Sequence, residues 1–419
     1  MVLKGRSLDR LIRLWLLENL VNFLGNGMVE IAILWTLIII TDNPTYVGLY
    51  IILKTLTGLV FTPIAGVMAD RFSRKKIIII SNLFRALTQI ITAVIILVFP
   101  SFTIAGLLIG ILCVTAGSNF FFPAVSSLIK DIIPREKFLQ ASAYRGACLQ
   151  GGYLVGASLS GFLLNLFAFP IILIIDACTY IVSIFIFLSF PEDREIKNEQ
   201  HSISVQFTLF KDIKEGLTYL RTNKKVYTFL LIGLGPGLGM VVINTFLSYY
   251  VHSQLKLTST HFGIIEGAYA IGAIFAGVLI GNIQKRLNSF NLATTSLLLF
   301  PILFFVMFFP INFYVLFITF IVFGVVVMVQ NSSFQTIITE STDGSFLGRV
   351  LSFNYFVTSA IFPLITLLIG LIVPKVLSVN ILFLCTGIFL LIVSILGVLY
   401  IQSLKRNISN QIEPFKEGI

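Results

Sequence analysis

The sequence predicts an all-α membrane protein with twelve transmembrane helices in two six-helix halves. Three observations point to this fold class. Of the 419 residues, 57% are hydrophobic and only 11% are charged, whereas a soluble domain carries about 25% charged residues. Apolar segments of membrane-spanning length recur along the chain, and a pattern near residue 65 returns near residue 276. This composition excludes soluble enzymes, secreted scaffolds and nucleic-acid-binding proteins, so we expect no nucleic-acid partner.

Each apolar segment is long enough to cross a bilayer, which takes about 20 residues. The first six predicted spans are 11–40, 45–69, 77–99, 102–130, 138–165 and 168–190. The last six are 227–250, 258–281, 289–309, 313–338, 347–373 and 377–401. The first segment has no small-residue cleavage site and runs directly into a full-length span, so we interpret it as a retained helix rather than a signal peptide.

The lysines and arginines orient these spans. With a cytoplasmic N-terminus, all but five of the 29 basic residues lie in the tails, loops and span ends on the cytoplasmic side. Of the five, Lys256 and Lys375 are on the opposite side, and Lys54, Arg85 and Arg145 lie within spans. The positive-inside rule therefore predicts a multi-pass membrane protein with both termini in the cytoplasm.

Four segments make up the predicted domain organisation. They are an N-terminal six-helix bundle over 1–190, a cytoplasmic linker over 191–226, a C-terminal six-helix bundle over 227–401 and a cytoplasmic tail over 402–419. Apolar residues recur in the linker at three- and four-residue spacing, namely Phe207, Phe210, Ile213, Leu217 and Leu220. This spacing predicts an amphipathic helix on the inner leaflet. Its simplest role is to connect the two halves, and a regulatory role is the alternative.

An internal repeat supports the division into halves. The segment Ala65–Lys75 at the end of the second span matches Ala276–Arg286 at the end of the eighth. At nearly the same separation, two further residues of the fourth span match two of the tenth: Asn119 with Asn331, and Phe122 with Phe334. Repeated halves predict a substrate site between them, near the membrane midplane.

Seven ionisable residues lie well inside the predicted spans, away from their ends, where one charge costs about 2.5 kcal/mol or more. The acids are Glu18, Glu30, Asp176 and Glu266, and the bases are Lys54, Arg85 and Arg145. A rise of about 1.5 Å per residue puts three pairs at matching depths: Glu30 with Lys54, Glu18 with Arg85, and Asp176 with Arg145. Each is either a structural ion pair or a proton-carrying site, because pairing is the usual way in which buried charges persist.

Glu266 is the acid that remains after this pairing, because all three bases lie in the N-terminal half. A carboxyl group without a charged partner in a low-dielectric environment favours its neutral form. Reversible protonation of Glu266 would therefore couple transport to protons, with Glu30 and Asp176 as further candidates. The alternative is a glutamate that stays protonated or hydrated and only shapes packing.

Uncharged polar residues within spans predict a substrate cavity. Asn22 and Asn26 precede Glu30 at intervals of four residues, which gives one polar stripe on the first span. The other candidates are Asn119, Tyr153, Asn244, Gln330 and Asn331. Hydrogen bonding between helices is the alternative role for such residues.

Short motifs add a family resemblance. Gly66-x-x-x-Asp70-Arg71-x-x-Arg74-Lys75, between the second and third spans, resembles motif A of the major facilitator superfamily. The segment Gly152-x-x-x-Gly156-Ala157-x-x-Ser160-Gly161 in the fifth span resembles a weakened antiporter signature that lacks its proline and one glycine. The segments Lys214–Arg221 and Phe346–Val350 are similar to the macrolide-efflux branch of bacterial facilitators. The resemblance implies the major facilitator fold and proton-driven export of an amphiphilic compound.

The resemblance also implies a cytoplasmic gate. Asp70 and Arg349 would bridge the two halves when the cavity opens outward, and a carboxylate and a guanidinium can form a bidentate pair. Arg71 and Arg74 would then be shared with Asp131. The alternative is that these basic residues serve only the positive-inside rule.

No nucleotide-binding or metal-ligand motif is present in the sequence. We therefore expect no enzyme activity, no metal and no cofactor other than a proton gradient. Together with the intramembrane charges, the resemblance implies a monomeric, proton-coupled antiporter of the bacterial plasma membrane. It would export lipophilic or amphiphilic small molecules, such as macrolide-like drugs, through the lipid bilayer. The alternatives are a lipid or siderophore exporter of the same fold and a transport-dead membrane sensor.

Overall fold

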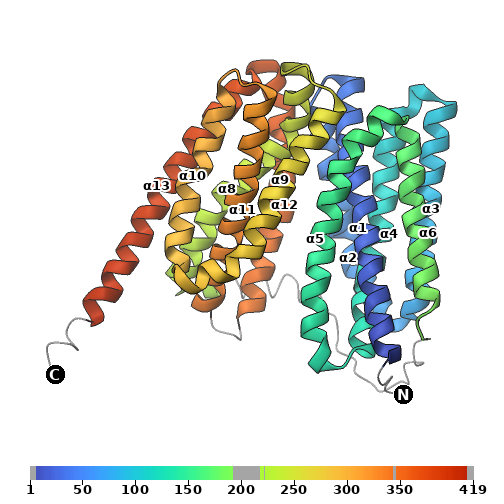
Figure 1. Ribbon diagram of the computed structural model, residues 1–419, viewed down its shortest axis with the longest axis horizontal. Coiled ribbons are helices and arrows are strands. Elements are labelled where there is room, and N and C mark those ends of the chain that lie inside the picture. Colours follow the sequence, from blue (N-terminus) through green and yellow to red (C-terminus); the bar gives the residue numbers. More distant parts are fainter. Residues whose placement is uncertain (1–5, 192–217, 221, 343–345, 413–419) are drawn as a thin grey trace. The chain divides into compact units, whose positions relative to one another are not determined.

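The structure is a computed structural model that describes residues 6–191, 218–220, 222–342 and 346–412. Its described residues form long α-helices and no β-strand (Figure 1). Eleven of these helices are long and apolar enough to cross a membrane, and α12 (Leu347–Val376) contains a shorter apolar stretch, Ile361–Ile372. The predicted class, an all-α multi-pass membrane protein, is confirmed.

The helices follow the predicted spans closely. The first six are α1 (Arg6–Thr41), α2 (Thr45–Arg71), α3 (Arg74–Val98), α4 (Thr103–Ile132), α5 (Arg135–Leu166) and α6 (Phe169–Leu188). The others are α8 (Lys224–Tyr249), α9 (Ser259–Arg286), α10 (Ser289–Phe308), α11 (Phe313–Ser341), α12 and α13 (Val379–Ile412). A π-helical turn, Tyr250–Gln254, continues α8. Agreement is close because hydropathy and breaking residues determine where a membrane helix starts and ends.

Asparagine and serine side chains cap several of these helices. The amide oxygen of Asn223 accepts from the backbone N–H of Val226 at 3.2 Å at the start of α8. Asn288 and Asn312 do the same at the starts of α10 and α11, and Ser73 caps α3. Such caps satisfy backbone N–H groups that have no partner within the helix.

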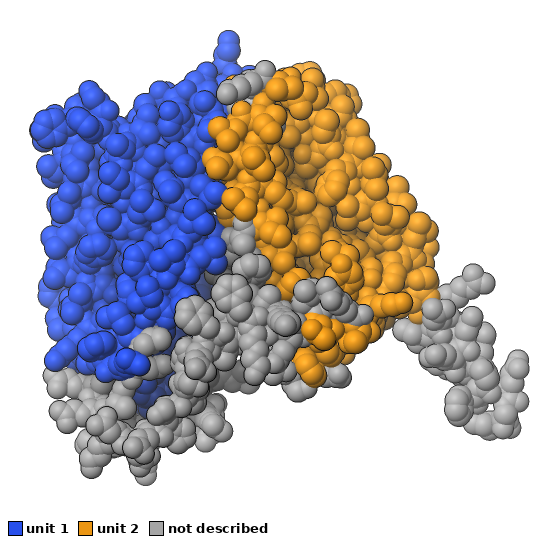
Figure 2. Space-filling model, turned by 180° about the vertical axis from the view of Figure 1, so that it is seen from behind, with its two compact units in different colours: residues 1–206, 251–267 blue, residues 207–250, 268–419 orange. Residues whose placement is uncertain are grey.

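The chain forms two compact units, coloured separately in Figure 2. Unit 1 comprises residues 1–206 and 251–267, and unit 2 comprises residues 207–250 and 268–419. Most of the predicted linker lies outside the described residues, as do four of its five apolar positions. The fifth, Leu220, is buried in unit 2. Residues 402–412, predicted as tail, continue α13 as helix.

The helices pair in the same order within each unit. In unit 1, α3 packs against α4 and α6, while α1 packs against α5 and α6. In unit 2, α10 packs against α11 and α13, while α8 packs against α12 and α13. The matching pattern is what the internal sequence repeat predicts.

In unit 1, α1 and α5 lie side by side with their backbones in close contact (Figure 1). A Cβ atom on Gly152 would lie 2.6 Å from the carbonyl oxygen of Leu20. Cβ atoms on Gly156 and Gly27 would collide with the carbonyl oxygens of Leu24 and Tyr153. Small residues allow membrane helices to approach this closely, so these glycines act in helix packing.

Candidate functional site

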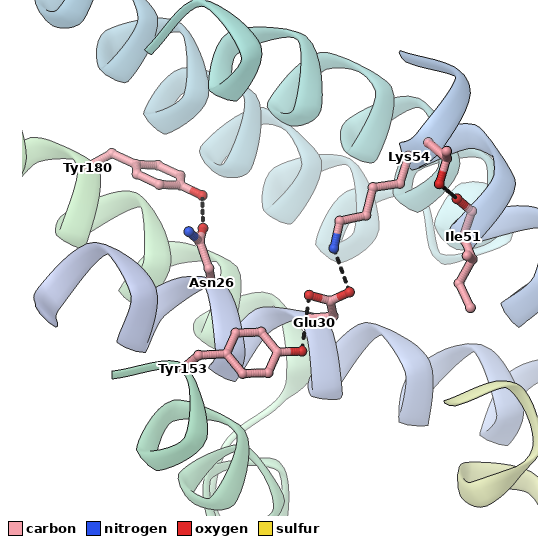
Figure 3. A network of polar contacts seen from close by, with 7 residues as sticks. Asn26, Glu30, Ile51, Lys54, Tyr153 and Tyr180 are labelled. Carbon is pink, nitrogen blue, oxygen red and sulfur yellow. Dashed lines mark hydrogen bonds and ion pairs between the residues drawn. The ribbon is translucent and has the colours of Figure 1, made fainter. Parts of the chain in front are cut away.

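A cluster of ionisable and phenolic groups joins α1, α2 and α5 at mid-membrane depth. The Lys54 ammonium donates to Glu30 Oε1 at 2.5 Å, and the Tyr153 hydroxyl donates to Glu30 Oε2 at 3.2 Å (Figure 3). The predicted Glu30–Lys54 pair is therefore present. The side chain of Lys54 is 40% exposed and that of Glu30 is 22% exposed, so the described residues cover the pair only in part.

Glu266, on α9, belongs to the same neighbourhood. It lies close enough to Glu30 and Tyr153 to interact with both electrostatically. The described residues form three ion pairs, and Glu266 is in none of them. We call Glu30, Lys54, Tyr153 and Glu266 the carboxyl cluster. The cluster contains two carboxyl groups and one ammonium group.

A second polar network lies deeper within unit 1 and is closed to solvent. At its centre, Arg85 on α3 is 0% exposed. Its guanidinium donates to the amide oxygens of Asn82, Asn22 and Asn26 at 3.0, 3.2 and 3.4 Å. It also lies 3.8 Å from the ring centroid of Tyr180. Neutral oxygens and an aromatic face thus surround the charge.

Two buried carboxyl groups complete this network. Glu18 Oε1 accepts from the Asn22 amide at 3.0 Å and from the Ser183 hydroxyl at 2.9 Å. Asp176 Oδ2 accepts from the Gln89 amide at 2.6 Å. We call the following residues the arginine network: Glu18, Asn22, Asn26, Asn82, Arg85, Gln89, Asp176, Tyr180 and Ser183.

The other two predicted pairings are not direct contacts. Asn22 stands between Glu18 and Arg85, because it donates to the first and accepts from the second. Asp176 faces α3, whereas Arg145 donates from Nε to the Asn19 amide oxygen on α1 at 3.1 Å. Neither Asp176 nor Arg145 belongs to an ion pair among the described residues.

The polar stripe on α1 is a hydrogen-bonded ladder. The Asn26 amide donates to Asn22 Oδ1 at 3.0 Å, and the Tyr180 hydroxyl donates to Asn26 Oδ1 at 3.0 Å (Figure 3). Asn22 was expected to line the cavity, but it is only 1% exposed. Because α3 and α6 cover this stripe, its amides serve interhelical bonding.

The remaining predicted cavity residues differ in their surroundings. Asn119 accepts from the Thr62 hydroxyl at 2.7 Å, and Asn244 and Asn331 are exposed. Gln330 is buried, and its Oε1 atom has no hydrogen-bond partner within the described part of the chain. Exposure alone does not assign these residues to a cavity.

Of the predicted gate, the structure describes one contact. Arg74 forms an ion pair with Asp131, as the resemblance implied, and Arg71 is exposed. The side chains of Asp70 and Arg349 lie outside the described set, so their pairing stays a prediction.

Four of the nine residues of the arginine network were not predicted from the sequence, namely Asn82, Gln89, Tyr180 and Ser183. Asn82, Arg85 and Gln89 are spaced by three and four residues and form one buried polar stripe on α3. That spacing was the available signal. Lys75 was also missed as a cap: its ammonium donates to the carbonyl oxygens of Leu188 and Phe190, at 3.0 and 2.6 Å.

Membrane-spanning helices in two units with matching internal packing, and charged groups within the spans, are features of a membrane transporter built from repeated halves. The chain belongs to the family described as transmembrane secretion effector, which matches residues 9–416.

The chain is 23% identical over 382 residues to macrolide efflux protein A of Streptococcus pyogenes, covering 90% of this chain and 92% of that protein. It is 27% identical over 294 residues to multidrug resistance protein 1 of Bacillus subtilis, covering 70% of this chain and 72% of that protein. Its fold resembles the crystal structure of the nucleoside transporter NupG, with a TM-score of 0.71 and 14% identity over 92% of this chain and 98% of that one.

These similarities confirm the predicted superfamily and its drug- and macrolide-efflux-like branch. The protein is a multi-pass membrane transporter and not an enzyme.

Proposed function

We propose that the protein is a proton-coupled antiporter that exports lipophilic or amphiphilic small molecules across the bacterial plasma membrane, with both termini in the cytoplasm. The observation that carries this proposal is the carboxyl cluster. It contains two carboxyl groups and one lysine ammonium; the ammonium pairs with Glu30, and that pair is partly exposed.

Charge balance explains how this cluster would couple to protons. A net negative charge in a low-dielectric site is costly, so the second carboxyl keeps a proton while its surroundings are dry. When water enters from the opposite side of the membrane, the ionised form is solvated and the proton leaves. Binding and release on opposite sides of the membrane make the cycle proton-driven.

Glu266 is the proposed principal proton carrier and Glu30 its partner. Lys54 already compensates Glu30, which leaves Glu266 as the carboxyl that gains most from a proton. Asp176 is a less direct candidate, because the arginine network encloses it at 0% exposure. A proton reaching Asp176 would first have to pass the amides around it.

The character of the exported compound rests on the relatives. Similar proteins are named for macrolide efflux and multidrug resistance. We therefore propose macrolide-like amphiphiles as the first compounds to test.

The test is transport by purified protein in proteoliposomes with an imposed pH gradient and a radiolabelled macrolide. Glu266→Gln mimics the protonated state, so we expect it to bind the macrolide and exchange it downhill, while gradient-driven accumulation is lost. Glu340→Gln is the matched control, because the same change is made at an exposed carboxyl near the end of α11. Gradient-driven accumulation by Glu266→Gln at the wild-type level would refute the role of Glu266. Absence of any response to the gradient in the wild type would refute proton coupling.

A further inference from the structure

The three intramembrane bases of unit 1 differ in how their charges are compensated. Lys54 holds Glu30 at 2.5 Å, and amide oxygens enclose Arg85. For Arg145, the described residues provide one hydrogen bond, from Nε to Asn19 Oδ1 at 3.1 Å. Glu18 interacts with it electrostatically, but no described carboxylate lies within ion-pair distance of its guanidinium. Both Nη groups therefore remain available as a fork of donors.

A second unsatisfied donor lies beside Arg145. The Arg145 guanidinium is 5.8 Å from the ring centroid of Trp15 on α1. Trp15 is only 3% exposed, and its indole N–H has no hydrogen-bond partner within the described residues. Buried polar groups are normally hydrogen-bonded, so each exception calls for an explanation.

The neighbouring asparagine does not supply the missing acceptor. Asn19 uses its amide oxygen on Arg145 and donates its amide N–H to the carbonyl oxygen of Trp15 at 2.7 Å. The unsatisfied atoms at this place are thus all N–H donors. Donors without acceptors select a ligand that supplies only acceptors, and an anion does so best.

The depth of Arg145 in the membrane also indicates a bound anion. Arg145 lies ten residues beyond the start of α5, or about 15 Å along the helix axis. Its side chain is partly exposed at that depth. An exposed guanidinium facing lipid there would be costly, so intramembrane charges face a cavity or a bound partner.

We propose that Arg145, with the indole N–H of Trp15, binds the anionic head group of an amphiphilic substrate. The head group is a carboxylate or a phosphate, and its oxygens accept hydrogen bonds from the two Nη groups and from the indole N–H. The planar guanidinium fork suits both groups. This inference names the substrate class of the proposed exporter and rests on that function for transport, but binding can be measured without it.

The anion site is separate from the carboxyl cluster. Tyr153, which contacts Glu30, lies eight residues from Arg145 on α5, or about 12 Å along the axis. The bound anion therefore does not neutralise the proton carrier directly. Substrate and proton occupy different sites of unit 1.

The experiment measures equilibrium binding to the purified full-length protein in an uncharged detergent. Three fluorescent amphiphiles share one dodecyl chain and carry a carboxylate, a phosphate or a neutral amide head group. We expect both anions to bind at least tenfold more tightly than the amide, and their relative affinities identify the preferred anion. Arg145→Gln should abolish the preference and leave amide binding unchanged. Lys130→Gln, which removes an exposed base near the end of α4, should behave as wild type.

Two further variants separate binding from folding. Arg145→Lys keeps the charge but loses the fork, so it should retain only part of the preference. Trp15→Phe keeps an aromatic ring, although a smaller one, and loses the N–H, so it should weaken anion binding severalfold without affecting binding of the amide. The chain has two tryptophans, so in a Trp35→Phe background the anions should perturb the emission of Trp15.

Equal binding of all three head groups by the wild type would overturn the proposal, and so would a preference that persists in Arg145→Gln. Should Arg145→Gln fail to fold, an unchanged preference in both Arg145→Lys and Trp15→Phe would overturn it instead. Head-group selectivity without gradient-driven transport would count against proton coupling alone. Gradient-driven transport without selectivity would count against the anion site alone.

Discussion

Replacing Arg85 by methionine removes the base from the arginine network and leaves its two carboxyl groups, those of Glu18 and Asp176. All three residues are at most 1% exposed, so water cannot compensate an uncovered charge. Both carboxyl groups interact electrostatically with the guanidinium, so we expect it to compensate one ionised carboxyl in the wild type. In Arg85→Met that carboxyl must take up a proton as the protein folds.

The cost follows from the proton uptake. An ordinary glutamate has a pKa of about 4.3, so protonating it at pH 7 costs about 3.7 kcal/mol, from ~1.36 kcal/mol per unit. Removing one partner from a buried charged pair costs about 3–5 kcal/mol in general. We therefore expect Arg85→Met to lower the free energy of unfolding by about 4 kcal/mol at pH 7.

The pH dependence identifies the cause. The folded variant binds one proton more than its unfolded chain, relative to wild type, so its stability decreases as pH rises. Lowering the pH from about 7.5 to about 5.5 should reduce the deficit by about 2.7 kcal/mol, at ~1.36 kcal/mol per pH unit. Adding Glu18→Gln removes one carboxyl and should restore the wild-type pH slope.

The assay is reversible unfolding by dodecyl sulfate in mixed micelles at several pH values. Lys76→Met is the control, because Lys76 is an exposed base on the same helix. A deficit of Arg85→Met that does not change with pH would refute the reasoning, because it would show that packing and hydrogen bonds, not charge balance, account for the loss.

Two other predictions concern packing and capping, and thermal unfolding in detergent checks both. Gly156→Leu should lower the free energy of unfolding by about 3 kcal/mol or more, because the new side chain would meet the backbone of α1. Gly146→Leu is the control and should have little effect, because nothing lies within 4 Å of a Cβ atom there. Lys75→Met should lower the free energy of unfolding by about 1–2 kcal/mol, because it removes the donor to the carbonyl groups at the end of α6. If Lys76→Met lowered it equally, the capping role of Lys75 would be contradicted.

The extent of each membrane helix could be predicted from the sequence, because the bilayer demands about 20 apolar residues and internal backbone bonding. The predicted span 168–190 corresponds to α6, Phe169–Leu188. The last span was placed at 377–401, whereas α13 continues to Ile412. Hydropathy cannot detect that extension, because residues 402–412 are mostly polar and helix formation there does not depend on the membrane.

Charge pairing was predicted from depth alone, and depth is only one of two coordinates of a residue on a helix. The prediction succeeded for Glu30 and Lys54, which lie at one level and face each other across α1 and α2. It failed for Asp176 and Arg145, which lie on consecutive helices at similar depth. Asp176 bonds to Gln89 on α3, and Arg145 bonds to α1. The missing coordinate was the rotation of each helix about its axis.

For α5 that coordinate was present in the sequence as a pattern of glycines. At 100° per residue, Gly152 and Gly156 lie within about 20° of Arg145 around the helix, seven and eleven residues further along. Both glycines contact the backbone of α1, so the face that carries Arg145 turns toward α1 and away from Asp176 on α6. Close contact between helices requires small side chains or none at the contact. The positions of small residues therefore indicate the rotation of a helix about its axis, whereas hydropathy indicates the depth of its residues in the membrane. The weakened antiporter signature thus indicates which helix the nearby charge faces, and it does so independently of any role in ion coupling.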